Sequence, residues 1–495
     1  MRWDTFILDA IGTNDEEEID MKKLTRALKR ADMAEPDWLN ENKVLLKACL
    51  NNNFEAAQTL LRSIDGIDVN QSDEDGWTPL YCASWKNKVG LVRELLSATN
   101  IQVNATGTGR TSPLFVACLL RHLEVVHLLL AVPGIQVNQA TNDGRTALFV
   151  ASQQGFLGCV HLLLRAKGIQ INQATNKGAT PLFAACFNNH VQVVQALLAK
   201  KEIQVNQANH DGATPLHIAC EHAHLDVIAA LLARKGIQIN QATNDGRTAL
   251  FVAGMMGHTD VVRTLLGVDG VDVNQADEGG ATPLTAACLE GHLDIVQLLL
   301  QVDGIQVNEL DTTEDMTALT AACMNGLLDI VHLLLQHKDI DVNRAISTGA
   351  TALSVACQHG HLRIVNALLN FDPRDDDKYD AESLRQRQTV DINKGPGKLT
   401  PLDVAIGNKH WDIVVRLEDI PSVKKPSYKR DEGYIRARNK ANVLQQMRIE
   451  IADNFASKSK TPGAGGLPTI LGGQGYFLPK PVESSGTYMQ FVKKE

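Results

Sequence analysis

The sequence predicts an all-α repeat solenoid, an array of helix-turn-helix units joined by β-hairpin-like turns. Tripeptides resembling Thr-Pro-Leu recur in steps of 34 residues six times, followed by steps of 35, 34 and 49. A phrase from Asn138 to Ala151 is also repeated unchanged from Asn240 to Ala253, 102 residues later, which is three periods. Such a period is typical of solenoids, because each unit buries its apolar face only by stacking on its neighbours. The tripeptides begin at Thr78, Ser112, Thr146, Thr180, Thr214, Thr248, Thr282, Thr317, Thr351 and Thr400.

One unit, residues 178–208, shows what each part of the period predicts. Gly178 tolerates the positive φ of a tight turn, and Thr180-Pro181 provides an N-cap followed by proline at the first helical position. Small side chains along the first helix allow the next unit to approach closely. A second helix is expected over Val191–Leu198, where the apolar residues Val193, Val194, Leu197 and Leu198 form one stripe.

The whole pattern resembles the ankyrin repeat. It reads Asp-Gly-x-Thr-Pro-Leu-x-x-Ala-Cys-x-x-x-His-Leu-x-Val-Val-x-x-Leu-Leu, followed by Val-Asn, and the segments 214–219 and 291–296 are nearly the family consensus. The resemblance implies an ankyrin-repeat domain over residues 40–420. We count eleven repeats there, with an insert at 371–389.

The two flanks differ in composition from the array. Residues 1–39 are expected to form a small helical segment, since Ile19, Leu24 and Leu28 have helical spacing. Residues 421–495 form a basic tail that contains glycine and proline, with a helix expected over Ile435–Phe455. Beyond Lys460 the Gly and Pro content predicts disorder, so the tail is expected to be partly disordered.

Composition restricts the classes of function. A formal net charge of -9 argues against a dedicated nucleic-acid binder, which needs a basic face. Neither a secretory signal nor an apolar run long enough to span a membrane is evident. Seven of the nine cysteines recur once per repeat, so free thiols in the cytoplasm or nucleus are expected. The seven are Cys49, Cys118, Cys186, Cys220, Cys288, Cys323 and Cys357.

Patterns that suggest chemistry have structural explanations. Five Cys-His pairs at i, i+4 have a spacing that suits zinc on a single helix. We instead assign each Cys to the core and each His to the turn that starts the second helix. The glycine run at 462–466 lacks the Lys-Ser/Thr of a phosphate-binding loop. The sequence therefore predicts no catalytic residue, no metal site and no cofactor. The Cys-His pairs are Cys118/His122, Cys186/His190, Cys220/His224, Cys288/His292 and Cys357/His361.

Partner-binding residues are expected where repeats differ, since packing positions are constrained. The resemblance implies that certain first-helix and turn positions line a concave groove. In this chain those positions are largely aromatic in the amino-terminal half and polar further on. Large exposed aromatic residues are typical binding anchors. The predicted contact residues are Trp77, Tyr81, Trp85, Lys86, Phe115, Leu119 and Phe187.

An asparagine recurs in each repeat after the second helix. Its side chain is expected to bond to turn backbone. The resemblance also implies that an oxygen-dependent hydroxylase can modify this asparagine, which would make the chain a substrate. The candidate positions are Asn138, Asn172, Asn206 and Asn240.

We therefore expect a non-catalytic, monomeric scaffold that binds another protein on its concave face and takes no small-molecule substrate. One alternative is an adaptor recruited to anionic membrane or nucleic acid by the basic tail. Another is an enzyme whose activity lies in a flank, although flanks of about 40 and 75 residues are short for a catalytic domain.

Overall fold

The computed structural model describes residues 41–63, 67–313, 315–371, 389–425 and 432–458. The helical segment expected over 1–39 lies outside the described residues. So do residues 372–388 of the insert and residues 426–431 and 459–495 of the tail, which include the stretch beyond Lys460 that the sequence predicts to be disordered.

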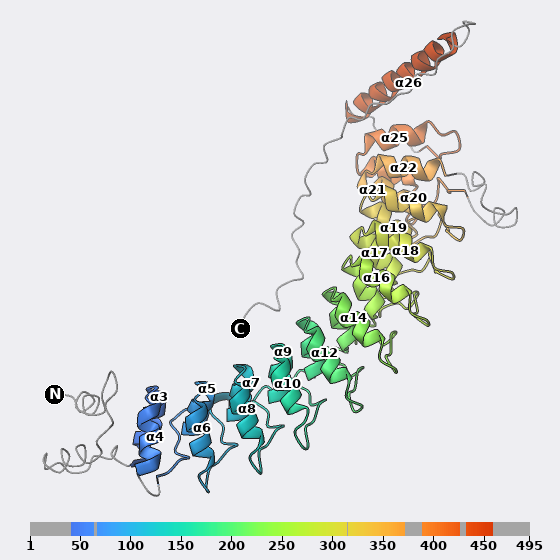
Figure 1. Ribbon diagram of the computed structural model, residues 1–495. Helices are drawn as coiled ribbons and strands as arrows, with labels where there is room; N and C mark the ends of the chain where they lie inside the picture. The colour runs from blue at the N-terminus through green and yellow to red at the C-terminus, as the bar shows by residue number, and fades with distance from the viewer. Residues whose placement is uncertain (1–40, 64–66, 314, 372–388, 426–431, 459–495) are drawn as a thin grey trace, which may run out of the picture. The chain divides into compact units, whose positions relative to one another are not determined.

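The described chain is an array of paired helices, which confirms the predicted all-α solenoid (Figure 1). Each first helix packs on the first helices of its neighbours, and each second helix packs on the second helices. The pairs are α3 (Glu41–Leu50) with α4 (Phe54–Ser63), α5 (Pro79–Trp85) with α6 (Val89–Leu96), α7 (Pro113–Leu119) with α8 (Leu123–Leu130), α9 (Ala147–Gln153) with α10 (Leu157–Leu163), α11 (Pro181–Phe187) with α12 (Val191–Leu198), α13 (Pro215–Glu221) with α14 (Leu225–Leu232), α15 (Ala249–Met255) with α16 (Thr259–Leu266), α17 (Pro283–Glu290) with α18 (Leu293–Leu300), α19 (Ala318–Met324) with α20 (Leu328–Gln336), α21 (Ala352–His359) with α22 (Leu362–Leu369), and α24 (Pro401–Gly407) with α25 (Trp411–Glu418).

The repeat at 178–208 forms as its residues predict. The Thr180 side chain accepts a hydrogen bond from the Phe183 N–H, and Pro181 is the first residue of α11. Such a cap contributes about 1 kcal/mol to helix stability. Gly178 has φ +80°, the left-handed conformation expected for this turn. The second helix, α12, has the predicted bounds and buries the predicted apolar stripe.

Tight turns at the tips of the repeats connect one unit to the next. In the turn before α11, Thr175 N–H donates to the Ala179 carbonyl at 2.9 Å, which closes a hairpin-like loop. Asn176 N–H donates to the Asp143 carbonyl of the preceding repeat at 3.0 Å. Among the described residues, the one isolated β-bridge pairs Asp311 with Met316. The turns therefore resemble β-hairpins without forming a regular sheet.

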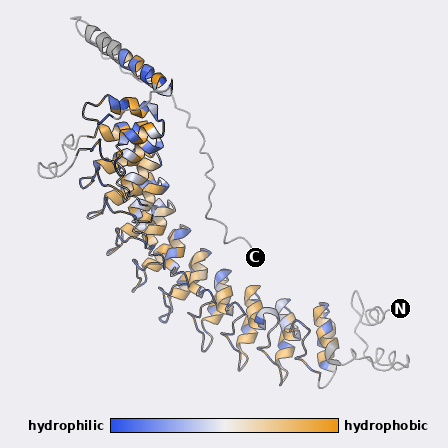
Figure 2. Cartoon of the chain, turned by 180° about the vertical axis from the view of Figure 1, so that it is seen from behind, coloured by the Kyte–Doolittle hydropathy of each residue, from blue (hydrophilic) through white to orange (hydrophobic). Residues whose placement is uncertain are grey.

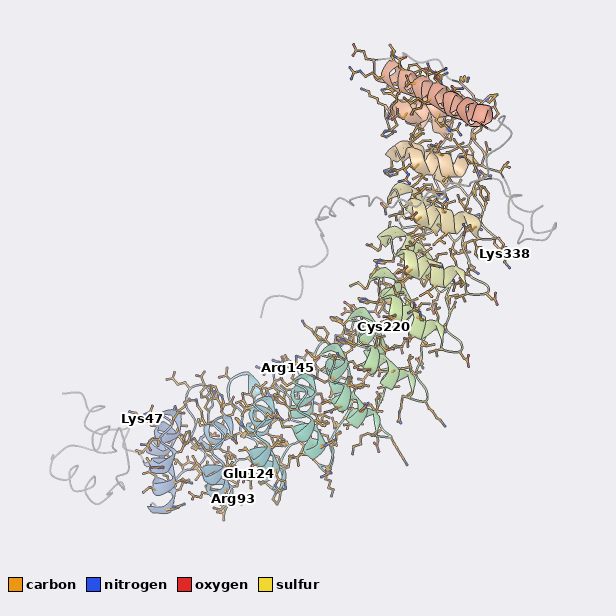
Figure 3. The ribbon with its side chains drawn as sticks, turned by 45° about the horizontal axis from the view of Figure 1, so that its top comes forward. Lys47, Arg93, Glu124, Arg145, Cys220 and Lys338 are labelled. Carbon is orange, nitrogen blue, oxygen red and sulfur yellow. The ribbon has the colours of Figure 1, made fainter. Side chains whose placement is uncertain are left out.

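The core lies between the helix pairs and continues from repeat to repeat. Figure 2 shows that the helices of the array are coloured mainly hydrophobic. A fully buried leucine contributes roughly 1.5 to 3 kcal/mol, and here it is covered only because the next repeat stacks on it. Ion pairs also join neighbouring second helices, such as Arg93 on α6 with Glu124 on α8 at 3.5 Å (Figure 3). Leucines with almost no exposed surface include Leu80, Leu114, Leu148, Leu182, Leu197 and Leu216.

The insert interrupts the sequence period without breaking the stack. Helix α24 packs against α21, so the 49-residue step still places one repeat directly after another. Asn343 Nδ2 donates to the Thr389 carbonyl at 2.8 Å, across the insert. Arg416 on α25 donates to the Asn366 side chain at 2.8 Å. The extra residues are therefore accommodated between two adjacent repeats.

The chain divides into two compact units, 1–430 and 431–495. The described element of the second unit is α26 (Glu432–Lys458), which confirms the helix predicted over Ile435–Phe455. Four apolar side chains on α26 are more than half exposed. No described helix is both long enough and apolar enough to cross a membrane. The four are Ile435, Val443, Leu444 and Met447.

Candidate functional site

Three aromatic side chains gather on and just before α5. Tyr81 and Trp85 are four residues apart on α5 and so lie on one side of the helix, and Trp77 directly precedes the N-cap Thr78. The ring centroids of Trp77 and Trp85 are 4.7 Å apart at 79°, an edge-to-face contact. Tyr81 stacks on Trp77 at 5.6 Å. Lys86 adds a cation, with Nζ 5.3 Å from the Trp85 ring centroid. We call these four residues the aromatic cluster.

The aromatic cluster is held in place by contacts with the next repeat. Tyr81 is 6% exposed, and its hydroxyl lies 3.1 Å from Thr111 Oγ1 in the next repeat. Burial raises the pKa of Tyr81 above its usual value, so the phenol stays neutral. Trp77 packs over Gly107, where an added Cβ would lie 2.6 Å from the Trp77 Cδ1 atom. The rings are thus held in place before any partner arrives.

The remaining predicted contact residues lie on α7 and α11. Phe115 is 4% exposed and belongs to the interior, as Tyr81 does. Leu119 is half-buried, whereas Phe187 is 38% exposed. Among the predicted residues, accessible surface is therefore offered by Trp77, Trp85, Lys86, Leu119 and Phe187.

Phe187 contacts an aromatic ring that is not among the predicted contact residues, that of His222. The His222 ring lies 4.9 Å from the Phe187 ring, centroid to centroid, and is tilted by 55°. His222 follows α13 in the next repeat. The sequence period indicates this contact, because Phe187 is seven residues after Thr180 and His222 is eight residues after Thr214. The two side chains therefore occupy adjacent positions of the period in neighbouring repeats. Leu120 and Met256 occupy the same eighth position and are also exposed.

The asparagines after the second helices connect adjacent repeats through both ends of the amide. Asn206 Nδ2 donates to the Gly236 carbonyl at 2.7 Å, and its Oδ1 accepts the Gln238 N–H at 3.0 Å. Asn138, Asn172 and Asn240 make the equivalent two bonds. All four side chains are half-buried. We call this series the asparagine ladder.

The Cys-His pairs have separate structural partners. The His190 ring Nε2 lies 3.0 Å from the Gln153 carbonyl of the preceding repeat. Burial raises the pKa of the Cys186 thiol well above its usual value. All nine cysteines are buried and none is in a disulfide. Protonated thiols and engaged imidazoles are poor metal ligands, and no group of three or more His, Cys, Asp or Glu among the described residues is arranged to hold a metal ion.

In the pair formed by Cys118 and Cys159, the pKa values of the two thiols are shifted in opposite directions. A hydrogen bond from Cys118 lowers the pKa of Cys159, and the charge of Arg121 acts in the same direction against the effect of burial. Burial raises the pKa of Cys118 itself. Cys159 is one of the two cysteines that are out of register with the repeat.

A family model described as ankyrin repeats (3 copies) matches the chain over residues 18–107, 100–175, 167–243, 238–311 and 304–380. The chain is an ankyrin repeat protein. A search of the curated proteins found no match. Ankyrin repeat domains are usually non-catalytic, and the ankyrin repeats suggest a role in protein-protein interaction.

Proposed function

We propose that this ankyrin repeat protein is a non-catalytic scaffold that binds a protein segment on the concave face of the array, between Trp77 and Phe187. The observation that supports this proposal is the accessible aromatic surface at the ends of two first helices, where Trp85 on α5 is half-buried and Phe187 on α11 is exposed. The aromatic cluster and the Phe187-His222 contact lie three repeats apart. A segment that reaches both would contact α5, α7, α9 and α11.

The aromatic cluster is suited to this role because its side chains lose little conformational entropy when a partner binds. Its rings already contact one another and the next repeat, so a partner would order few additional side chains. Tyr81 and Phe115 support the rings from inside the array, while Trp85, Lys86, Leu119 and Phe187 present surface. Trp and Tyr are enriched among residues that dominate binding energy.

The test compares two double variants of the full chain. Trp85→Ala/Phe187→Ala removes the proposed anchors, and Leu225→Ala/Leu293→Ala removes two exposed apolar side chains from second helices. Quantitative affinity capture from cell lysate is followed by direct binding of the enriched protein. At about 2 kcal/mol for each anchor, the first variant should weaken binding by several hundredfold or more. Thermal unfolding of both variants should resemble that of the wild type. Equal capture by both would contradict the proposal.

A second candidate, recruitment to anionic membrane or nucleic acid by the tail, has one observation in its favour. Helix α26 carries exposed Val443 and Met447 together with cations such as Arg436 and Lys440. Salt-sensitive sedimentation with phosphatidylserine vesicles by the full chain, lost in a chain that ends at residue 425, would favour this role. Binding to a partner protein that survives the same truncation would favour the array. An activity in either flank remains a further alternative, tested by loss of turnover on deleting that flank.

We further propose that the repeat domain spans residues 40–420 and comprises eleven repeats, from α3 and α4 to α24 and α25. Asn138, Asn172, Asn206 and Asn240 are proposed hydroxylation positions, on the ground of the family resemblance. Because both ends of each amide bond to the next repeat, a hydroxylase would require local opening of the array. Peptide mass spectrometry that finds no added oxygen at these residues, in chain purified from cells, would contradict this part.

A further inference from the structure

Six cations lie at the ends of three consecutive second helices. Arg165 and Lys167 follow α10, and equivalent pairs follow α12 and α14. These three helices pack in succession along the array (Figure 1). The loops 164–169, 198–203 and 232–237 contain a single carboxylate, that of Glu202, so six cations and one anion give a local formal charge of +5 in a chain of net charge -9. We call the six residues the basic strip: Arg165, Lys167, Lys200, Lys201, Arg234 and Lys235.

The repeat itself does not require these cations. The negative end of a helix dipole favours a cation at the C-terminus, which accounts for part of their presence. Yet the corresponding loop after α8, residues 130–135, contains no charged residue. The loop after α16, residues 266–271, contains only the anion Asp269. The loops that follow the second helices on both sides of the strip therefore contain no cation.

Two of the six cations hold the repeats together, and four do not. Lys200 Nζ donates to the Leu164 carbonyl at 2.9 Å, and Arg234 Nη2 donates to the Lys200 carbonyl at 3.2 Å. The other four side chains are exposed, and within the described residues they make no hydrogen bond or ion pair. These four are Arg165, Lys167, Lys201 and Lys235.

The asparagine ladder fixes the backbone of the same loops. The carbonyls of Gly168, Glu202 and Gly236, which directly follow the cation pairs, accept hydrogen bonds of 2.7 Å from ladder asparagines of the preceding repeats. The loops therefore have fixed positions relative to one another. Charges on them form a preorganised row rather than three independent groups.

We propose that the basic strip binds an acidic segment of a partner protein, a run of Asp or Glu residues in extended conformation. Packed helices are about 10 Å apart, so three repeats place the outer cation pairs about 20 Å apart. An extended chain rises about 3.3 Å per residue, so about six residues span that length. The strip follows second helices, and it shares no residue with the surface proposed above.

The net charge of the chain favours a short segment over a large polyanion. A nucleic acid or an anionic membrane presents charge well beyond the strip, and the net negative charge of the chain opposes its approach. Screening limits an exposed charge to about 8 to 10 Å at moderate salt, which is about the spacing of one repeat. A short acidic segment interacts mainly with the cations that it touches.

The experiment measures fluorescence anisotropy of a labelled octaglutamate peptide titrated with the full chain. Lys167→Glu/Lys201→Glu/Lys235→Glu reverses three charges of the strip. The matched control, Lys177→Glu/Lys338→Glu/Lys398→Glu, makes the same change in net charge at three exposed lysines elsewhere; Lys338 is seen in Figure 3. Circular dichroism verifies that both variants unfold near the wild-type temperature.

We expect wild type and control to bind with similar affinity, and the strip variant to bind at least about tenfold more weakly, which is about 1.4 kcal/mol. Binding should weaken with added salt. Equal losses in the two variants would overturn the proposal, because they would show a general charge effect. Octaglutamate binding that the strip variant retains, while its binding to a DNA duplex or to phosphatidylserine vesicles is lost, would overturn it in favour of those ligands.

Discussion

The asparagine ladder makes a direct prediction about how one repeat stabilises the next. Asn206→Ala removes two inter-repeat hydrogen bonds, one of 2.7 Å to the Gly236 carbonyl and one of 3.0 Å from the Gln238 N–H. A typical hydrogen bond contributes about 0.5 to 1.5 kcal/mol to stability. Because the side chain is half-buried and water can reach the groups left behind, we expect a loss of about 2 kcal/mol for the pair, rather than the maximum.

The loss should be measured locally as well as globally, since long repeat arrays do not always unfold in one step. Urea denaturation followed by circular dichroism gives the global value. Hydrogen exchange at the Gln238 amide gives the local one, and 2 kcal/mol corresponds to roughly thirtyfold faster exchange. Gln192→Ala, at an exposed position of α12, is the control. Unchanged exchange at Gln238 in Asn206→Ala would refute the assignment of the ladder as an inter-repeat clamp.

The remaining predictions concern turns and a buried histidine. Ala223 has φ +54°, at a position where several other repeats have glycine, and a left-handed non-glycine residue costs about 1 to 2 kcal/mol, so Ala223→Gly should raise the thermal midpoint. Gly257→Ala should lower it, since the new Cβ would lie 2.6 Å from His292 Cε1; equal midpoints would contradict either statement. Burial lowers the pKa of His217 in the folded chain, so as the pH falls the unfolded chain takes up the proton before the folded chain does. The free energy of unfolding should therefore fall as the pH drops below about 6.5 towards the lowered folded pKa. His217→Gln should flatten that dependence in urea titrations between neutral and acidic pH, and an unaltered slope would contradict it.

The positions of the helices could be predicted because local chemistry and period agree. Thr180 caps α11, Pro181 starts it, and the stripe over 191–198 defines α12, all within one unit. The continuity of the helix stack across the insert was harder to predict from the sequence. The bond from Asn343 to Thr389 joins residues 46 apart, and the sequence period alone does not show that the stack is kept.

The accessibility of the candidate site residues could not be predicted to the same degree. Tyr81 and Phe115 share a position three residues after the cap, and stacking of the next repeat buries both. Phe187, seven residues after its cap, stays exposed. The difference arises from contacts between repeats, which a single unit does not contain. The basic strip could not be predicted for another reason: its cations come from three loops 34 residues apart in the sequence, which the stacking of α10, α12 and α14 brings together.

The two proposed surfaces share a physical origin. In each repeat of an ankyrin array, stability comes from the same recurring residues, namely the amides of the asparagine ladder, the helix caps and the small core residues. Residues outside that set therefore vary at little cost to folding. Trp85 and Phe187 occupy variable repeat positions on first helices. The variable positions after second helices hold Lys167, Lys201 and Lys235. Both sets lie on backbone that the neighbouring repeats already fix. A partner that carries an apolar anchor and an acidic run on one chain would therefore gain from both surfaces, because binding at one raises the effective concentration at the other.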